Sequence, residues 1–184
     1  MGTWKTRGLR GSTLEDLINH TNESYREKKL ALIQKIPTPI TPIEIDKSSR
    51  HITLAYFEQK STVDYIGAVQ GIPVCFDAKE CAVKNIFLCK NIHPHQIKFM
   101  EEFEQQGGIS FIIVHYTAMD EMYYVPFADV KKILGTAWKQ AGERVLLMMK
   151  LTKTGKYVPN RDMYVHYLEP LSIDLSQREN KQEL

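Results

Sequence analysis

The chain has 184 residues, of which 43% are hydrophobic and 25% charged, and its formal net charge at pH 7 is +2. This length suits one domain with its own core, and neither a disulfide nor a structural metal is required for folding. The sequence shows no apolar run of roughly 20 residues that would span a membrane, no signal peptide in its first ten residues, and no Cys-x-x-Cys pair among its three cysteines. We therefore expect a cytoplasmic protein, while the near-neutral charge excludes no class of partner.

The first expected element is a helix over about residues 13–28. Ser12 and Glu15 have the spacing of a capping box, and apolar residues then recur at helical intervals. A short apolar run at 30–33 predicts the first strand.

Three prolines interrupt regular structure in the next stretch, residues 37–58. Residues 43–45 and 51–57 have the pattern of two arms of a ribbon around a polar turn at 47–50. The segment has too little apolar sequence for a core of its own, so we expect a projecting β-hairpin, a stalk inserted in the domain. A hairpin that only covers a sheet edge or stabilises a dimer is the alternative.

The elements expected after the stalk are strands over 62–70 and 72–80, a helix from 93–94 to the glycines at 107–108, strands over 109–116 and 122–125, and a helix over 128–139. This order predicts an α/β fold with a mixed central sheet flanked by helices, in a single domain spanning 1–184. We expect residues 1–10 and 175–184 to be flexible.

Acidic and basic side chains alternate on the second of the two strands that follow the stalk. Asp77 and Lys79 are two residues apart, so they share one strand face, which we expect to be open because Val74, Phe76 and Ala78 point to the core. The first strand brings Asp64 towards Asp77. Neighbouring carboxylates repel each other unless a cation lies between them, and oxygen ligands favour Mg²⁺ or Mn²⁺. The triplet by itself is also compatible with an ordinary solvated strand face.

A resemblance to a nuclease family narrows this interpretation. The chain resembles the PD-(D/E)xK nuclease superfamily and, within it, the RecU family of Holliday-junction resolvases. Six motifs between about residues 10 and 115 carry the resemblance: Arg10-Gly11-x-x-Leu14-Glu15, Asn19-x-Thr21-Asn22-x-x-Tyr25, Pro37-Thr38-Pro39, Ser61-Thr62-Val63-Asp64-Tyr65, Phe76-Asp77-Ala78-Lys79-Glu80 and His95-Gln96.

The resemblance implies a role for each residue of the expected site. The magnesium ligands it implies are Thr62, Asp64, Asp77 and Gln96. Lys79 is implied as the residue that stabilises the transition state, and Glu15 is similar to the acid that many of these nucleases bring to the same site. The chain departs from the family pattern in having Asp77 where glutamate is usual, and Val63 where the superfamily often has proline.

The function implied is magnesium-dependent cutting of four-way DNA junctions by a homodimer, through paired nicks, in recombination and repair. Its cofactor is Mg²⁺, with Mn²⁺ as a substitute, and recombination proteins are expected partners. The residues expected to contact DNA are Arg10 in a basic N-terminal arm and Lys35, Lys47 and Arg50 in and near the stalk. A nuclease that cuts linear duplex and a non-catalytic junction-binding protein remain the alternatives.

Overall fold

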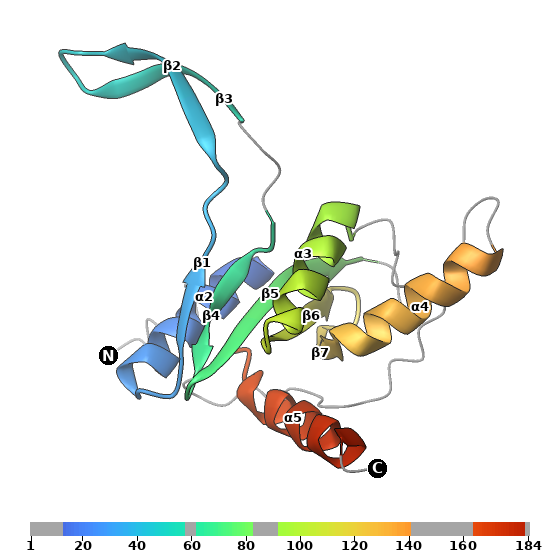
Figure 1. The fold of residues 1–184 in the computed structure, drawn as a ribbon. Helices are drawn as coiled ribbons and strands as arrows, with labels where there is room; N and C mark the ends of the chain where they lie inside the picture. Colours follow the sequence, from blue (N-terminus) through green and yellow to red (C-terminus); the bar gives the residue numbers. More distant parts are fainter. Residues whose placement is uncertain (1–12, 58–61, 83–91, 141–163, 183–184) are drawn as a thin grey trace.

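The computed structural model describes residues 13–57, 62–82, 92–140 and 164–182. A five-stranded sheet has the order β1-β4-β5-β6-β7, and a separate two-stranded sheet is made of β2 and β3 (Figure 1). The strands of the larger sheet are β1 (Leu32–Lys35), β4 (Tyr65–Val69), β5 (Ile72–Cys81), β6 (Ile109–Tyr116) and β7 (Glu121–Pro126). Only the β5–β6 pair is parallel among these neighbours, which confirms the predicted mixed sheet.

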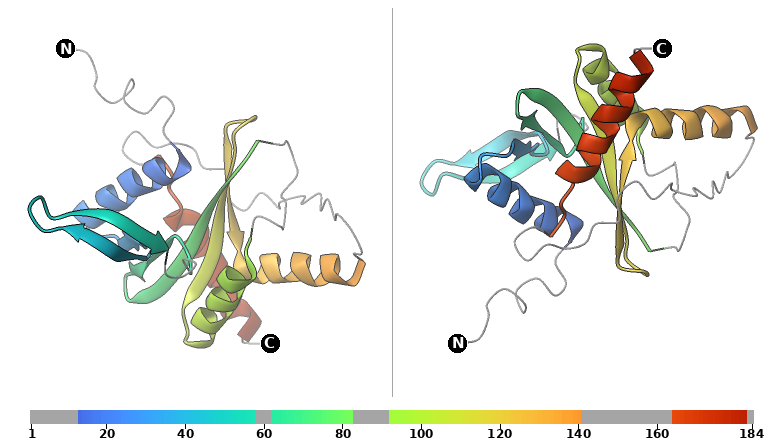
Figure 2. Two further views of the ribbon diagram at one scale, coloured as in Figure 1. Left: turned by 90° about the horizontal axis from the view of Figure 1, so that it is seen from above. Right: turned by 90° about the horizontal axis from the view of Figure 1, so that it is seen from below.

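Helices cover both faces of this sheet. One core cluster joins the sheet to α2 (Leu14–Glu27) and α5 (Leu168–Gln182), and the other joins it to α3 (Pro94–Gln105) and α4 (Phe127–Gln140). Figure 2 shows α2 and α4 on opposite sides of the sheet. Since both faces are covered, the central strands lie in the interior, and β6 is an almost continuous run of buried residues.

A row of aromatic rings crosses the sheet under α2 and α5. Phe76 stacks between Tyr65 and Phe111, with ring centroids 4.7 Å away on each side, and Tyr124 continues the row 4.4 Å from Phe111. Tyr167 packs over Phe76 at 5.0 Å. Aromatic contacts of this kind add to the large apolar area that each ring buries, so this row is a main stabilising element of the fold.

The N-terminus of α2 lies one residue further along the chain than expected. Thr13 is the N-cap, its hydroxyl accepts a hydrogen bond from the Asp16 amide, and the Asp16 carboxylate accepts one from the Thr13 amide at 3.2 Å. The prediction of a box between Ser12 and Glu15 is therefore wrong, and Ser12 itself lies outside the described residues. Because Asp16 and not Glu15 completes the capping box, the side chain of Glu15 is available for another contact.

The first strand begins two residues later than expected. The Leu30 amide donates to the Tyr25 carbonyl at 2.9 Å, and Lys29 has a left-handed φ of 55°, so both residues close the end of α2. The apolar run that suggested a strand at 30–33 thus serves partly as a helix terminus.

The hairpin formed by β2 (Ile40–Asp46) and β3 (His51–Phe57) projects away from the main sheet, as the sequence predicted (Figure 1). Asp46 shapes its tip, because the carboxylate accepts hydrogen bonds from the amide and hydroxyl of Ser48 at 2.9 and 2.7 Å. Large apolar side chains are exposed along both strands: Ile40, Ile43, Ile45, Ile52, Leu54, Tyr56 and Phe57. Such an apolar surface on an isolated hairpin is typical of a surface that another molecule covers.

Residues 164–167 pack along α2, and their contacts give three residues of the Asn19–Tyr25 motif a structural role. The Val165 amide donates to the Thr21 hydroxyl at 3.0 Å, and the Tyr167 hydroxyl donates to the side-chain oxygen of Asn22. The Tyr25 hydroxyl lies 2.8 Å from a ring nitrogen of His166. Thr21, Asn22 and Tyr25 are therefore buried because they hold a segment that is distant in the chain.

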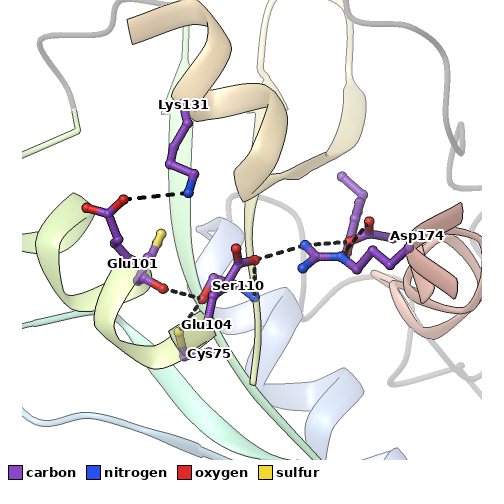
Figure 3. Close-up of polar contacts among 9 residues, drawn as sticks. Cys75, Glu101, Glu104, Ser110, Lys131 and Asp174 are labelled. Atoms are coloured by element: carbon purple, nitrogen blue, oxygen red, sulfur yellow. Dashed lines mark hydrogen bonds and ion pairs between the residues drawn. The ribbon is translucent and has the colours of Figure 1, made fainter. Parts of the chain in front are cut away.

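Helix α5 covers a region where the sequence predicted no element, and it includes residues 175–182, for which a flexible tail was expected. Arg178 lies between Glu104 of α3, at 2.9 Å, and Asp174 one helical turn earlier, at 3.0 Å. Figure 3 shows this polar network, in which the main-chain amide of Ser110 also donates to the Glu104 carboxylate. Among the described residues, no helix is both long enough and apolar enough to cross a membrane.

Candidate active site

Two carboxylates meet where β4 begins and β5 passes. The Asp64 carboxylate accepts a hydrogen bond from the Ala78 amide at 2.8 Å, which places it beside Asp77 on the neighbouring strand. Asp77 is fully buried, whereas Asp64 is partly exposed. The two predicted acids are thus brought together, but the expectation of an open strand face is wrong at Asp77, because α3 covers this part of β5.

Lys79 forms an ion pair with Asp77 from two residues along the same strand face. Burial raises the pKa of the Asp77 carboxyl, the nearby Asp64 carboxyl adds to this effect and Lys79 opposes it, and together they bring the pKa to about 8. At neutral pH the acid pair therefore favours either a bound proton or a bound cation over two bare negative charges.

Gln96 closes the buried side of the acid pair. Its side-chain amide donates to Asp77 Oδ1 at 2.9 Å, and its carbonyl oxygen accepts from the His93 amide at 3.0 Å. One buried side chain therefore both caps the start of α3 and holds a carboxylate of the site. Thr62 lies exposed two residues before Asp64, and the buried Val63 between them anchors this turn in the core under α3.

Glu15 lies beside the acid pair and not within it. Its carboxylate forms an ion pair with Lys35, the last residue of β1. The Tyr65 hydroxyl donates to the main-chain carbonyl of Glu15 at 3.2 Å, which fixes the first turn of α2 next to the start of β4. Glu80, which ends the Phe76–Glu80 motif but was assigned no role from the sequence, accepts a hydrogen bond from the Leu14 amide at 2.7 Å and ties the same turn to β5.

Comparisons with known proteins identify the family. The family model described as "Recombination protein U" (RecU) matches residues 9–173. The chain belongs to the RecU family. The resemblance inferred from the six motifs is thereby confirmed, and the match extends well beyond the region that carried them.

Named relatives lie at about 40% identity. The chain is 41% identical over 152 residues to "Holliday junction resolvase RecU" of Limosilactobacillus reuteri (strain DSM 20016), which covers 79% of this chain and 72% of that protein. It is 39% identical over 155 residues to the protein of the same name from Geobacillus kaustophilus, with 82% and 76% covered. The protein of that name from Leuconostoc citreum is 46% identical over 124 residues, with 66% and 60% covered.

The donor set around the acid pair of this RecU-family chain fits a magnesium-like ion. It offers two carboxylates, and the described parts of the chain contain no group of three or more His, Cys, Asp or Glu side chains placed to hold a metal. Gln96 turns its amide nitrogen to Asp77 and its oxygen to the His93 amide. A site of this kind suits an ion that keeps several of its own waters. Asp77 Oδ2 is buried and accepts no well-formed hydrogen bond, so apart from Lys79 it has capacity for a cation.

The residues expected to contact DNA lie in two places. Lys47 and Arg50 are exposed at the tip of the hairpin, whereas Lys35 lies at its base, next to the acid pair. Arg10 lies outside the described residues. Lys47 and Arg50 therefore lie far from the acid pair, at the end of the hairpin, whereas Lys35 lies close to it.

Proposed function

We propose that this chain is a divalent-cation-dependent endonuclease that cuts four-way DNA junctions. The single observation that carries the proposal is the placement of Asp64, Asp77 and Lys79 together at one site of a RecU-family chain. The named relatives are Holliday junction resolvases, and this chain covers 72–76% of the length of two of them, which supports the same substrate class here.

The residues of the site divide the chemistry among them. Asp64 and Asp77 would hold Mg²⁺, or Mn²⁺ in its place, with the Thr62 hydroxyl as a further donor. Gln96 would join them once its side-chain amide turns its oxygen from the His93 amide to the ion. Such an ion supplies a Lewis acid for the phosphate and lowers the pKa of a bound water. Lys79 directs its ammonium to the charge that develops on the phosphate during attack. Burial of Asp77 makes this arrangement cation-dependent, because at neutral pH its carboxylate needs a positive partner beyond Lys79.

A homodimer would match the two-fold symmetry of the substrate, with one site per subunit nicking each of two opposed strands. The exposed apolar side chains of the hairpin, among them Phe57 at 75% exposure, support pairing with a second copy along this surface. Lys47 and Arg50 at the tip would then meet phosphates near the centre of the junction. Such paired nicks serve recombination and repair in the cytoplasm, alongside recombination proteins.

Cleavage of a synthetic four-way junction in Mg²⁺ tests the proposal. The wild-type chain is expected to make symmetric nicks, and Asp77→Ala is expected to bind the junction without cutting it. The matched control is Asp129→Ala, which removes a partly exposed carboxylate from α4, away from the acid pair. Preference for linear duplex would favour a duplex-cutting nuclease, and tight binding with no turnover in Mg²⁺ or Mn²⁺ would favour a binding protein. Gel filtration with light scattering measures whether the chain is dimeric.

A further inference from the structure

A groove of about 310 Å³ opens at the start of β1, where α2 ends. Arg26 and Lys29 line it from the end of α2, and Leu32 and Ala68 line it from the sheet. Its volume lies at the lower end of the range for ligand-binding pockets, roughly 300–1,000 Å³. The acid pair lies at the other end of the β1–β4 pair, beside Lys35, so the groove is a separate feature of the surface.

Strand β1 is an edge strand of the five-stranded sheet, because the strand order begins with β1 and continues with β4 (Figure 1). The Ile36 amide donates to the Asp64 carbonyl at 2.8 Å, which extends the β1–β4 register by one hydrogen-bonded pair. In an antiparallel ladder such pairs alternate with pairs that do not bond each other, so the main-chain groups of Ile33 and Lys35 point away from β4. The edge therefore offers amide donors and carbonyl acceptors to another extended chain.

The two faces of this edge differ in chemical character. Ile33 packs against the core cluster that contains α2, so Leu32 points to the opposite face of the sheet. Leu32 is 62% exposed, and Ala68, its partner in the register, is exposed as well. Arg26 and Lys29 are exposed at the end of α2 and directly after it. A chain added along β1 would therefore meet cations on one face and apolar side chains on the other.

These features favour an acidic peptide over other occupants. Cations and a short length, four residues here, are features that keep a sheet edge from pairing with copies of itself. A nucleic acid would match the cations, but its backbone has neither the hydrogen-bonding pattern of a strand nor an apolar group for Leu32. An extended peptide has both, and acidic residues at every second position would all face the side of Arg26 and Lys29.

We propose that the groove at the start of β1 binds an acidic, extended segment of a partner protein, which adds to the sheet as a further strand. Carboxylates of the segment pair with Arg26 and Lys29, and its apolar side chains cover Leu32. Its main chain bonds the outward-facing amide and carbonyl of Ile33. Such binding is independent of junction cutting, because the groove lies at the end of β1 that is remote from the acid pair.

Fluorescence anisotropy of the full chain with a panel of short fluorescein-labelled peptides tests the proposal. In these peptides aspartate or glutamate alternates with valine, isoleucine or leucine, and control peptides carry lysine in place of the acids. Wild type is expected to bind acidic members of the panel and to leave the lysine peptides unbound. Arg26→Gln combined with Lys29→Gln should weaken binding about three- to tenfold, because two ion pairs are lost. Leu32→Thr should weaken it about threefold, because less apolar surface is covered. Lys98→Gln combined with Lys132→Gln is the matched control, since it removes the same charge from exposed positions of α3 and α4.

Amide hydrogen exchange measured by NMR distinguishes strand addition from simple attraction of charges. In the peptide complex the Ile33 amide should exchange about tenfold or more slowly than in the free chain, because it gains a hydrogen bond. The amides of Leu32 and Gln34, which face β4, serve as internal references and should change less.

Three results would overturn strand addition at the groove: no binding of any acidic peptide by wild type, equal binding by the Arg26/Lys29 variant and the control variant, or an unprotected Ile33 amide in the complex. Weaker junction binding by the Arg26/Lys29 variant than by the control variant would identify the groove as a DNA contact and would overturn it too. Junction cutting by wild type in Mg²⁺ would still support the proposed function in each case.

Discussion

Replacing Asp77 by asparagine is expected to stabilise the cation-free protein while abolishing cleavage. Asparagine has nearly the same shape, can accept the hydrogen bond from Gln96, and can donate one to the Asp64 carboxylate, which Asp77 in its charged form cannot do. The substitution removes a buried negative charge, so the repulsion within the acid pair disappears. It also removes the ion pair with Lys79, whose opposing effect is already contained in the raised pKa of Asp77.

The size of the effect follows from the pKa of Asp77. The carboxyl has a pKa of about 8 in the folded protein and an ordinary value of 3.8 when unfolded. When the pKa of a group is higher in the folded protein than in the unfolded chain, the protein is most stable at a pH below the pKa of the unfolded chain. That stability is lost as the pH rises through the pKa of the folded protein. At pH 7 the upper bound on the lost stability is about 4 kcal/mol. The pKa of about 8 already contains the opposing effect of Lys79. Because an asparagine amide reproduces the hydrogen bonds of the neutral carboxyl only in part, we expect a net gain of about 1–3 kcal/mol for the asparagine variant.

Thermal unfolding in the presence of a chelator, from pH 4 to pH 8, measures this gain. The melting temperature of Asp77→Asn should exceed that of wild type by about 2–4 °C per kcal/mol, and the difference should vanish towards pH 4 and grow towards pH 8. Glu102→Gln, at an exposed position of α3, is the control and should change little. Added Mg²⁺ should raise the melting temperature of wild type only. An asparagine variant that is less stable than wild type at pH 8, or a difference independent of pH, would refute the reasoning.

Three further predictions concern other parts of the molecule. Gln96→Leu should lower the free energy of unfolding by about 1–2 kcal/mol and abolish cleavage, because Asp77 and the His93 amide both lose a hydrogen-bond partner. Urea unfolding measures the first effect and the junction assay the second. Phe76→Ala should cost about 3–5 kcal/mol in urea unfolding, since it empties the middle of the aromatic row. Changing both Lys47 and Arg50 to alanine should weaken junction binding and reduce its salt dependence by about one contact per residue, with an unchanged melting temperature. An unchanged salt slope would mean that the hairpin tip does not contact phosphates.

The sequence was most informative where a local pattern determines structure. The apolar run over 109–116 has the bounds of β6, and the prolines with the polar turn predicted the projecting hairpin. The alternation of residues on β5 correctly placed Asp77 and Lys79 on one face. Each of these features depends on neighbours in the chain, which a sequence displays directly.

The features that the sequence did not predict depend on contacts between distant residues. Alternation gives the side of a strand but does not say what covers it, and Asp77 is buried because Gln96 arrives on a separate helix. Helix α5 was missed because its sequence is largely polar and its position depends on Arg178 contacting Glu104, 74 residues away in the chain. The pairing of Glu15 with Lys35 likewise required a three-dimensional structure.

Strand β5 carries both Asp77 and Lys79, and it is bonded to β4 on one side and to β6 on the other. Peptide groups held from both sides exchange their hydrogens only when large parts of a protein open. Asp77 and Lys79 therefore lie on a strand that resists local unfolding, whereas sites built on surface loops can unfold before the rest of a protein. On heating, catalytic competence and tertiary structure should disappear in a single step, and the enzyme should have no warm, folded but inactive form.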